Sequence, residues 1–193
     1  MAAVDLIDEA LVDVDDAEQY INLEAGFDDQ RVKKLINGVS IALQNITERK
    51  FTPDVVCQDT RLMFDYCATE FQVIQNIICD WTPVTELTTL TIDGTVYTSD
   101  VGIDPDTGLL VLSVALSTSK EFCPLIIDYK AGYTAVPEDI KQVVLDTVSF
   151  YWKRDFLEYD TEVARAMQGG RPDESFFPMT TRKVIREYTR DRL

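Results

Sequence analysis

Two stretches of helical periodicity, separated by a long strand-like segment, constrain the fold of this chain more than any other feature. The first covers residues 28–49 and the second residues 137–152. The apolar positions on one face are Val32, Leu35, Ile36, Val39, Leu43 and Ile46 in the first, and Ile140, Val143, Val144, Val148, Tyr151 and Trp152 in the second. Steps of three and four residues predict amphipathic helices that bury one face each.

Residues at the ends of these stretches support the helices and add a shorter one. Acids from Asp13 to Glu18 open a short amphipathic run, where the helix dipole favours negative charge. Pro137 occupies a first-turn position that suits proline. We therefore expect helices within residues 13–51 and 137–168, with a helical pattern resuming over residues 161–167.

The segment between the helices has the pattern of antiparallel strands. Asp93-Gly94 is a dipeptide typical of two-residue hairpin turns, and Asp104 to Gly108 forms another turn sequence. The expected strands are two within residues 54–80, then 85–92, 95–98, 109–114 and 124–129. The sequence thus predicts a mostly helical α+β fold. In it, a small antiparallel β module (54–130) is inserted between the second and third helices of a bundle, and an extended tail (169–193) follows a domain at 1–168.

Composition narrows the range of functions. The chain has 193 residues, 46% of them hydrophobic, and no histidine. The hydrophobic share is enough for a buried core, whereas the missing histidine removes Ser-His-Asp and Cys-His catalysis and His-ligated zinc. No apolar run reaches the roughly 18 residues of a membrane span, and residues 1–5 lack the basic and apolar parts of a secretory signal. We expect no enzyme activity and no membrane partner.

No motif for a metal or a cofactor is present. Cys57, Cys67, Cys79 and Cys123 have no C-x-x-C spacing, and we expect them to be small buried thiols in a reducing compartment. Glycine-rich phosphate-binding loops are missing. The acidic turn at residues 104–108 lacks the spacing of a calcium loop. We expect neither cofactor nor metal.

Charge is distributed unevenly along the chain. The formal net charge is −16, and residues 1–30 contain ten acids and no Lys or Arg. Residues 176–193 contain five basic residues and two acids. The overall charge argues against wrapping of DNA on a basic face. The asymmetry fits either surfaces used in assembly or simply solvated chain ends.

The C-terminal segment combines large apolar residues with the basic ones. Phe176, Phe177 and Met179 follow Gly169-Gly170, a pair that suits a hinge. Two interpretations stay open: the apolar residues fold back on the chain's own core, or they dock into another subunit as an amphipathic segment enters a groove.

Several sequence stretches, in this order, resemble the head–tail connector (adaptor) proteins of long-tailed bacteriophages. The stretches are residues 14–23, the helix from Asp28 that ends at Phe51, residues 81–94, and IDYKAGY at residues 127–133 with the helix after Pro137. The C-terminal stretch from Phe177 to Arg192 also resembles the family's proline-then-basic tail. The acidic extension at residues 1–12 and the length of segment 158–176 depart from the family pattern.

The resemblance implies a structural virion protein, assembled in the host cytoplasm, in the neck between head and tail. It implies a ring of about twelve copies that contacts the portal protein on one face and a stopper or tail-completion protein on the other, while DNA passes through the lumen. An acidic lumen would repel phosphate, and the same charge disfavours self-association, so we expect a monomer in the absence of portal.

The C-terminal segment is the docking candidate that the resemblance implies. We expect its apolar side chains to anchor on the portal and its basic ones to pair with portal acids. The expected docking residues are Phe176, Phe177, Pro178, Met179, Arg182, Lys183, Val184, Ile185, Arg186, Tyr188 and Arg190. Truncation after Gly170 should then leave a folded core that no longer binds portal.

Three other functions remain open on the sequence. The chain could be a stopper or tail-completion protein one ring further down, or an acidic regulatory protein that forms a one-to-one complex with an enzyme. The third is an enzyme. A hydrolase that binds its metal through carboxylates alone is the class of enzyme most compatible with the missing histidine.

Overall fold

The structure is a computed structural model that describes residues 4–24, 28–64, 77–97, 101–112, 122–153 and 174–189. The chain forms two compact units. Unit 1 consists of Met1–Thr52 together with Ala135–Leu193, and unit 2 is Pro53–Thr134. The chain therefore leaves the first unit after its second helix and returns to it before the third, as the two helical stretches predict.

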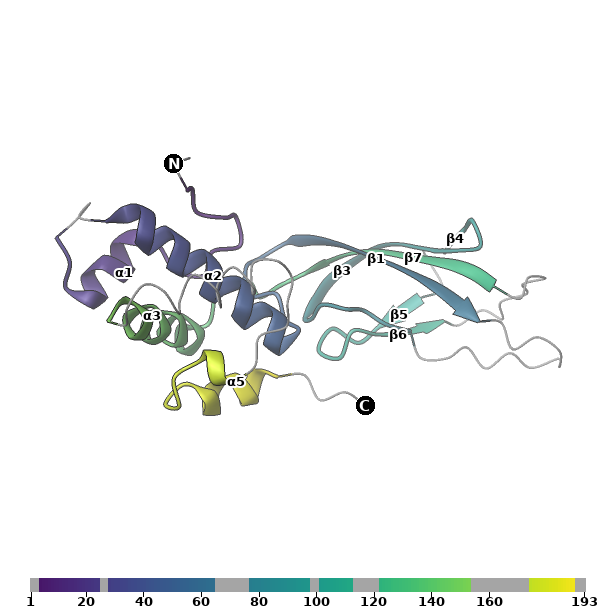
Figure 1. Cartoon of the computed structure of the whole chain (residues 1–193). Coiled ribbons are helices and arrows are strands. Elements are labelled where there is room, and N and C mark those ends of the chain that lie inside the picture. Colours follow the sequence, from purple (N-terminus) through teal and green to yellow (C-terminus); the bar gives the residue numbers. More distant parts are fainter. Residues whose placement is uncertain are drawn as a thin grey trace. The chain divides into compact units, whose positions relative to one another are not determined.

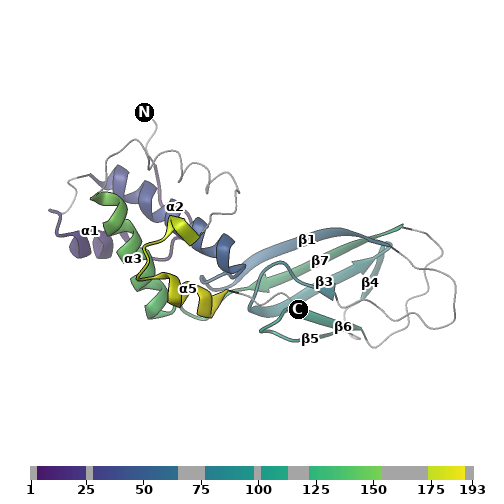
Figure 2. The same ribbon diagram turned by 60° about the horizontal axis from the view of Figure 1, so that its bottom comes forward.

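Unit 1 is built from helices. Its elements are α1 (Val14–Ile21), α2 (Asp29–Thr47), α3 (Glu138–Trp152), the short 3-10 helix η1 (Glu174–Phe176) and α5 (Arg182–Tyr188). Helix α3 contacts α1, α2 and α5, and it lies between α1 and α5 in Figure 1 and in Figure 2. Residues 161–167, where a helical pattern was expected to resume, lie outside the described residues.

The core of unit 1 forms where the two predicted apolar stripes meet. All the predicted positions on α2 are buried, and so are those on α3 apart from Trp152. Arg31 of α2 reaches this end of α3, where its guanidinium lies 4.2 Å from the centre of the Trp152 ring and donates to the Trp152 carbonyl. The two stripes thus form one interface, as their periodicity predicts.

The N-terminal segment lies along α2. The amides of Ile7 and Leu11 donate to the side chains of Asn37 and Ser40, at 3.2 Å each. Lys50 forms an ion pair of 2.6 Å with Glu9. The described part of the acidic extension is therefore held by the chain's own second helix.

Unit 2 contains two antiparallel sheets. One has the strand order β1 (Val55–Phe64), β7 (Phe122–Ala131), β3 (Val84–Ile92) and β4 (Thr95–Tyr97). The other has the order β2 (Ile77–Ile78), β6 (Leu109–Leu112) and β5 (Val101–Ile103). Buried side chains of both sheets form one hydrophobic cluster, which includes Ile77 and Leu110 from the second sheet and Leu90 and Ile127 from the first.

A buried polar network fixes β1 and β7 to the chain before β3. The phenol of Tyr129 accepts a hydrogen bond from the amide of Trp81 at 3.0 Å and donates to the carboxylate of Asp59 at 3.1 Å. Asp59 also accepts from the amide of Asp80, and Arg61 pairs with both carboxylates. Burial raises the pKa of Asp59, against the effect of these hydrogen bonds.

The expectation of a mostly helical fold with a small β module is wrong. The described residues contain four α-helices and seven strands, and the strands fill a unit with its own core. Strands β1 and β7 pair over ten residues each, and β7 also pairs with β3 on its other side. The predicted hairpin at Asp93-Gly94 is confirmed, since both residues have the positive φ that such a turn requires, 47° and 81°.

The expectation of an extended C-terminal tail is also wrong for residues 174–189. This segment forms η1 and α5, and α5 contacts α2 and α3. The tail therefore belongs to unit 1, because its apolar residues complete the core of that unit.

Candidate docking site

Three of the apolar residues predicted to dock are buried within the chain itself. Phe176, Phe177 and Ile185 have almost no exposed surface. The Phe176 ring lies 5.2 Å from that of Tyr151 on α3 and 5.0 Å from that of Phe177. These side chains hold η1 and α5 on the helical unit and leave little surface for a partner.

Tyr188 anchors the end of α5 in the same way. Its ring lies 5.6 Å from that of Phe51 in an edge-on arrangement, and its carbonyl accepts a hydrogen bond of 2.7 Å from Arg49. Its hydroxyl donates to Asp139 at the start of α3. The end of α5 is thereby attached to α3 and to the segment that follows α2.

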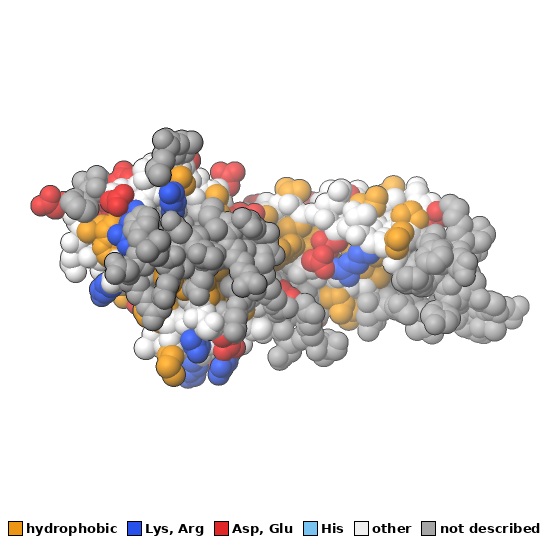
Figure 3. Space-filling view, viewed as in Figure 1, with side chains coloured by type: hydrophobic (Ala, Val, Ile, Leu, Met, Phe, Trp, Pro, Cys, Tyr) orange, Lys and Arg blue, Asp and Glu red, His pale blue; other side chains and the backbone are white. Residues whose placement is uncertain are grey.

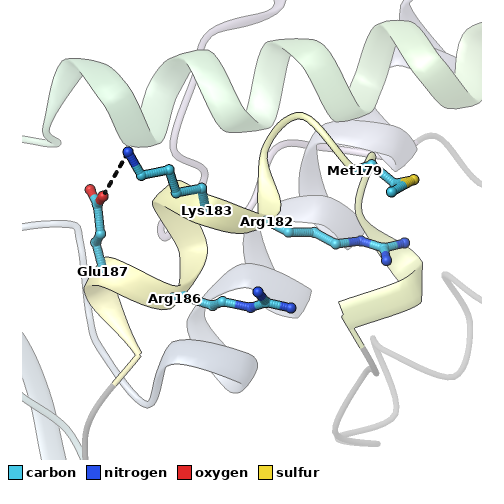
Figure 4. A pocket seen from close by; sticks show the side chains of 5 residues that line it. All are labelled: Met179, Arg182, Lys183, Arg186 and Glu187. Carbon is cyan, nitrogen blue, oxygen red and sulfur yellow. Dashed lines mark ion pairs between the residues drawn. The ribbon is translucent and has the colours of Figure 1, made fainter.

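The remaining residues of the segment form a surface with a shallow pocket. We call Met179, Arg182, Lys183, Arg186 and Glu187, which line it, the α5 surface. Figure 4 shows Arg182 and Arg186 extending along one side of the helix and Lys183 and Glu187 along the other. Met179 is 83% exposed, which is unusual for a large apolar side chain. Pro178 and Val184 are half-buried beside this surface, and Arg190 lies outside the described residues.

Two of the three basic side chains on the α5 surface form ion pairs. Arg186 pairs with Glu174 of η1 at 2.6 Å, and Lys183 lies 3.8 Å from Glu187. Arg182 donates through Nε to the carbonyl of Phe177 at 3.1 Å. The guanidinium of Arg186 lowers the pKa of Glu174 through hydrogen bonds, and Glu174 raises the pKa of Arg186.

This arrangement suits recognition of an acidic partner surface. In Figure 3, Lys and Arg side chains gather at the lower edge of the helical unit, where α5 lies in Figure 1. An exposed methionine among basic groups offers apolar contact with a charged rim, a combination typical of protein interfaces. The buried phenylalanines beneath keep this surface in a fixed shape.

Two contacts that shape the site were not predicted from the sequence. Glu174 lies twelve residues before its partner Arg186, and Tyr151 lies on a helix far from Phe176 in the sequence. The rules for side-chain pairs apply to residues three or four positions apart on one helix. They therefore predict neither contact.

Other kinds of site find no support among the described residues. These residues contain no group of three Cys, Asp or Glu side chains placed to hold a metal ion. None of their helices combines the length and hydropathy needed to cross a bilayer. The turn at residues 104–108 is held by Asp104, which accepts hydrogen bonds from the Thr107 hydroxyl at 2.7 Å and from the amide of Asp106.

Comparison with known proteins gives a family and two similar structures. The sequence model of head completion proteins matches residues 10–190. A chain in the neck of an empty gene transfer agent particle, computed with C6 symmetry, superposes with a TM-score of 0.62 at 16% identity, covering 100% of this chain and 96% of that one. A chain in the virion of a native gene transfer agent particle gives 0.50 at 15% identity, covering 89% and 95%. No curated protein matches the chain.

Proposed function

Because the chain belongs to the head completion protein family, we propose that it is a non-catalytic structural protein of the virion neck, assembled in the host cytoplasm. In this proposal it is a head–tail connector whose ring joins the portal to a stopper or tail-completion protein and lets DNA pass through the lumen. The resemblance noted in the sequence and the fold shared with two neck and virion chains both support this assignment.

One observation carries the docking part of the proposal. The C-terminal segment presents Met179, Arg182 and Lys183 outward while Phe176 and Phe177 fix it to the core. A preformed surface loses little conformational entropy on binding. We therefore assign docking on the portal to the exposed residues of the α5 surface, and we assign a supporting role to the buried ones.

The net charge of −16 supports the role of a DNA conduit. A ring of about twelve such chains would be strongly negative, so that phosphate groups are repelled and duplex DNA slides without being held. The α5 surface is basic although the protein as a whole is acidic. Its charge is complementary to that of a partner protein with an acidic surface.

Charge reversal on the α5 surface tests this proposal. We expect the double variant Arg182→Glu and Lys183→Glu to bind purified portal protein at least about tenfold more weakly than the unmodified chain, because attraction becomes repulsion. Lys34→Glu is a matched control on the same unit, because Lys34 is an exposed lysine of α2. Titration calorimetry or a quantitative pull-down measures the difference.

The outcome separates the candidate functions. Loss of binding in the double variant but not in the control supports docking through α5. Equal binding by all three proteins contradicts it. Binding of the unmodified chain to a stopper but not to the portal would place it one ring lower. A one-to-one complex with a host enzyme would favour a regulatory role.

A further inference from the structure

The outer face of the four-stranded sheet carries rows of side chains that come from neighbouring strands. The register places Val56 opposite Lys130 and Gln58 opposite Asp128. A third row crosses the whole sheet through Thr60, Ile126, Thr91 and Val96. We call the outer sheet face the surface formed by Val56, Gln58, Thr60, Leu62, Glu86, Thr89, Thr91, Val96, Ile126, Asp128 and Lys130.

Large apolar side chains on this face are exposed. Val56 is 78% exposed and Leu62 is 67% exposed, and Val96 is exposed as well. Cys57 and Asp59, which alternate with the outward residues along β1, point to the opposite side and are buried. Strand alternation thus turns one side of β1 into the core and leaves valine and leucine on the other.

The charged groups on the outer sheet face have their partners within the face itself. Lys130 forms an ion pair of 2.7 Å with Glu86. Asp128 accepts hydrogen bonds of 2.6 Å from both Gln58 and Thr89, which lower its pKa. The face carries two acids and one base, or a net charge of −1, in a chain whose total is −16.

The outward side of the strand at the border of this face lacks two of the usual protections of a sheet edge. Among the described residues β1 pairs with β7 alone, and the two strands stay in register without a bulge from Val55 to Phe64. The outward residues from Val56 to Leu62 include no lysine and no proline, which commonly block further strand pairing. At the other edge, β4 is only three residues long.

We propose that the outer sheet face, up to its border strand β1, is a contact surface for a second copy of this chain. This inference rests on the ring of the proposed function and names its subunit interface. Two copies of a chain with a charge of −16 repel each other least where each is close to neutral, and apolar contact gains free energy there. The charged α5 surface is left for a different partner.

The proposed contact between copies can be tested by changing the ionic strength. Repulsion between acidic copies is screened over about 3 Å at 1 M salt but over about 30 Å at 0.01 M, whereas apolar contact persists in salt. We expect the isolated chain to sediment as a monomer in 10 mM sodium chloride and to self-associate in 1 M sodium chloride, in analytical ultracentrifugation at about 100 μM chain.

Variants locate the contact. Val56→Lys with Leu62→Lys should lower the association constant in 1 M salt at least tenfold, because two lysines on the edge oppose apolar contact and strand pairing. Val111→Lys is the control, since Val111 is an exposed valine on the other sheet. Circular dichroism confirms that each variant is folded, and if the edge variant is not, Val96→Lys on the same face replaces it.

The association measurements either support or contradict the proposed contact surface. Association in salt that is lost in the edge variant but kept in Val111→Lys supports it. A monomer at both salt concentrations, or equal loss in both variants, overturns it. Portal binding by the α5 surface is measured separately, so that failure of this interface and failure of the proposed docking function give different results.

Discussion

The hydroxyl of Tyr151 on α3 donates a hydrogen bond of 2.7 Å to the backbone carbonyl of Phe176. Both residues are buried, and the contact joins the end of the third helix to the start of the C-terminal segment. An apolar ring at the same place would leave the Phe176 carbonyl without this donor. The relationship shows that the C-terminal segment is part of the core of unit 1.

Tyr151→Phe removes this donor and keeps the ring. We expect the free energy of unfolding to fall by about 1–3 kcal/mol, because a buried carbonyl loses its partner. Chemical denaturation followed by circular dichroism measures the change. An unfolding midpoint identical to that of the unmodified chain would mean that the bond contributes no net stability.

Substitutions within the C-terminal segment should distinguish core residues from surface residues by their effects on stability. Phe177→Ala should destabilise the chain by about 3–5 kcal/mol, since a fully buried ring is replaced by a cavity. Met179→Ala should change stability by less than about 0.5 kcal/mol, because that side chain is exposed. If both variants unfold at the same denaturant concentration, the Phe177 ring does not stabilise the core.

The pair formed by Glu174 and Arg186 predicts a dependence on pH. The pKa of Glu174 is lower in the folded chain than in the unfolded one, so its ionised form stabilises the fold. This contribution is complete above the unfolded value of about 4.3 and is lost as pH falls through the lower folded value. We expect the unmodified chain to lose more thermal stability between pH 6 and pH 3 than Glu174→Gln does.

Thermal unfolding at four pH values in this range makes the comparison. Glu187→Gln is the control, because it removes one carboxylate from the same surface and leaves the Arg186 pair intact. Parallel curves for the unmodified chain and Glu174→Gln would show that the pair does not stabilise the segment.

The buried network of unit 2 gives a separate prediction. Tyr129→Phe removes the phenol oxygen that accepts from the Trp81 amide, and with it a hydrogen bond to Asp59. We expect a loss of about 1–3 kcal/mol in the free energy of unfolding and faster hydrogen exchange at the Trp81 amide. Unchanged exchange at that amide would contradict the role assigned to the phenol.

The helices of unit 1 and the hairpin turn were predictable because their signals are local. The stripe from Val32 to Ile46 has a period of 3.6 residues whatever it packs against. The Asp93-Gly94 turn depends on the backbone preferences of two residues alone. The size of the β unit was underestimated, because the length of β1 is determined by its pairing with β7, which comes much later in the chain.

The conformation of the candidate docking segment was only partly predictable from the sequence. Sequence pattern singled out the segment from Phe176 to Tyr188, but apolar residues that face the chain's own core have the same spacing as those that face a partner. In the single chain, Phe176, Phe177 and Ile185 are buried in its own core. Truncation after Gly170 would therefore remove part of the core, and the point variants Arg182→Glu and Lys183→Glu are the sharper test of docking.

Two features of the proposal can be observed in the assembled particle: the position of this chain and the surface that contacts its partner. Electron cryo-microscopy of the neck, at a resolution that separates helices, tests them most directly. We expect the chain to form a ring against the portal, with α5 at the portal side. A ring that does not touch the portal, or an α5 turned toward solvent in the assembled neck, would contradict it.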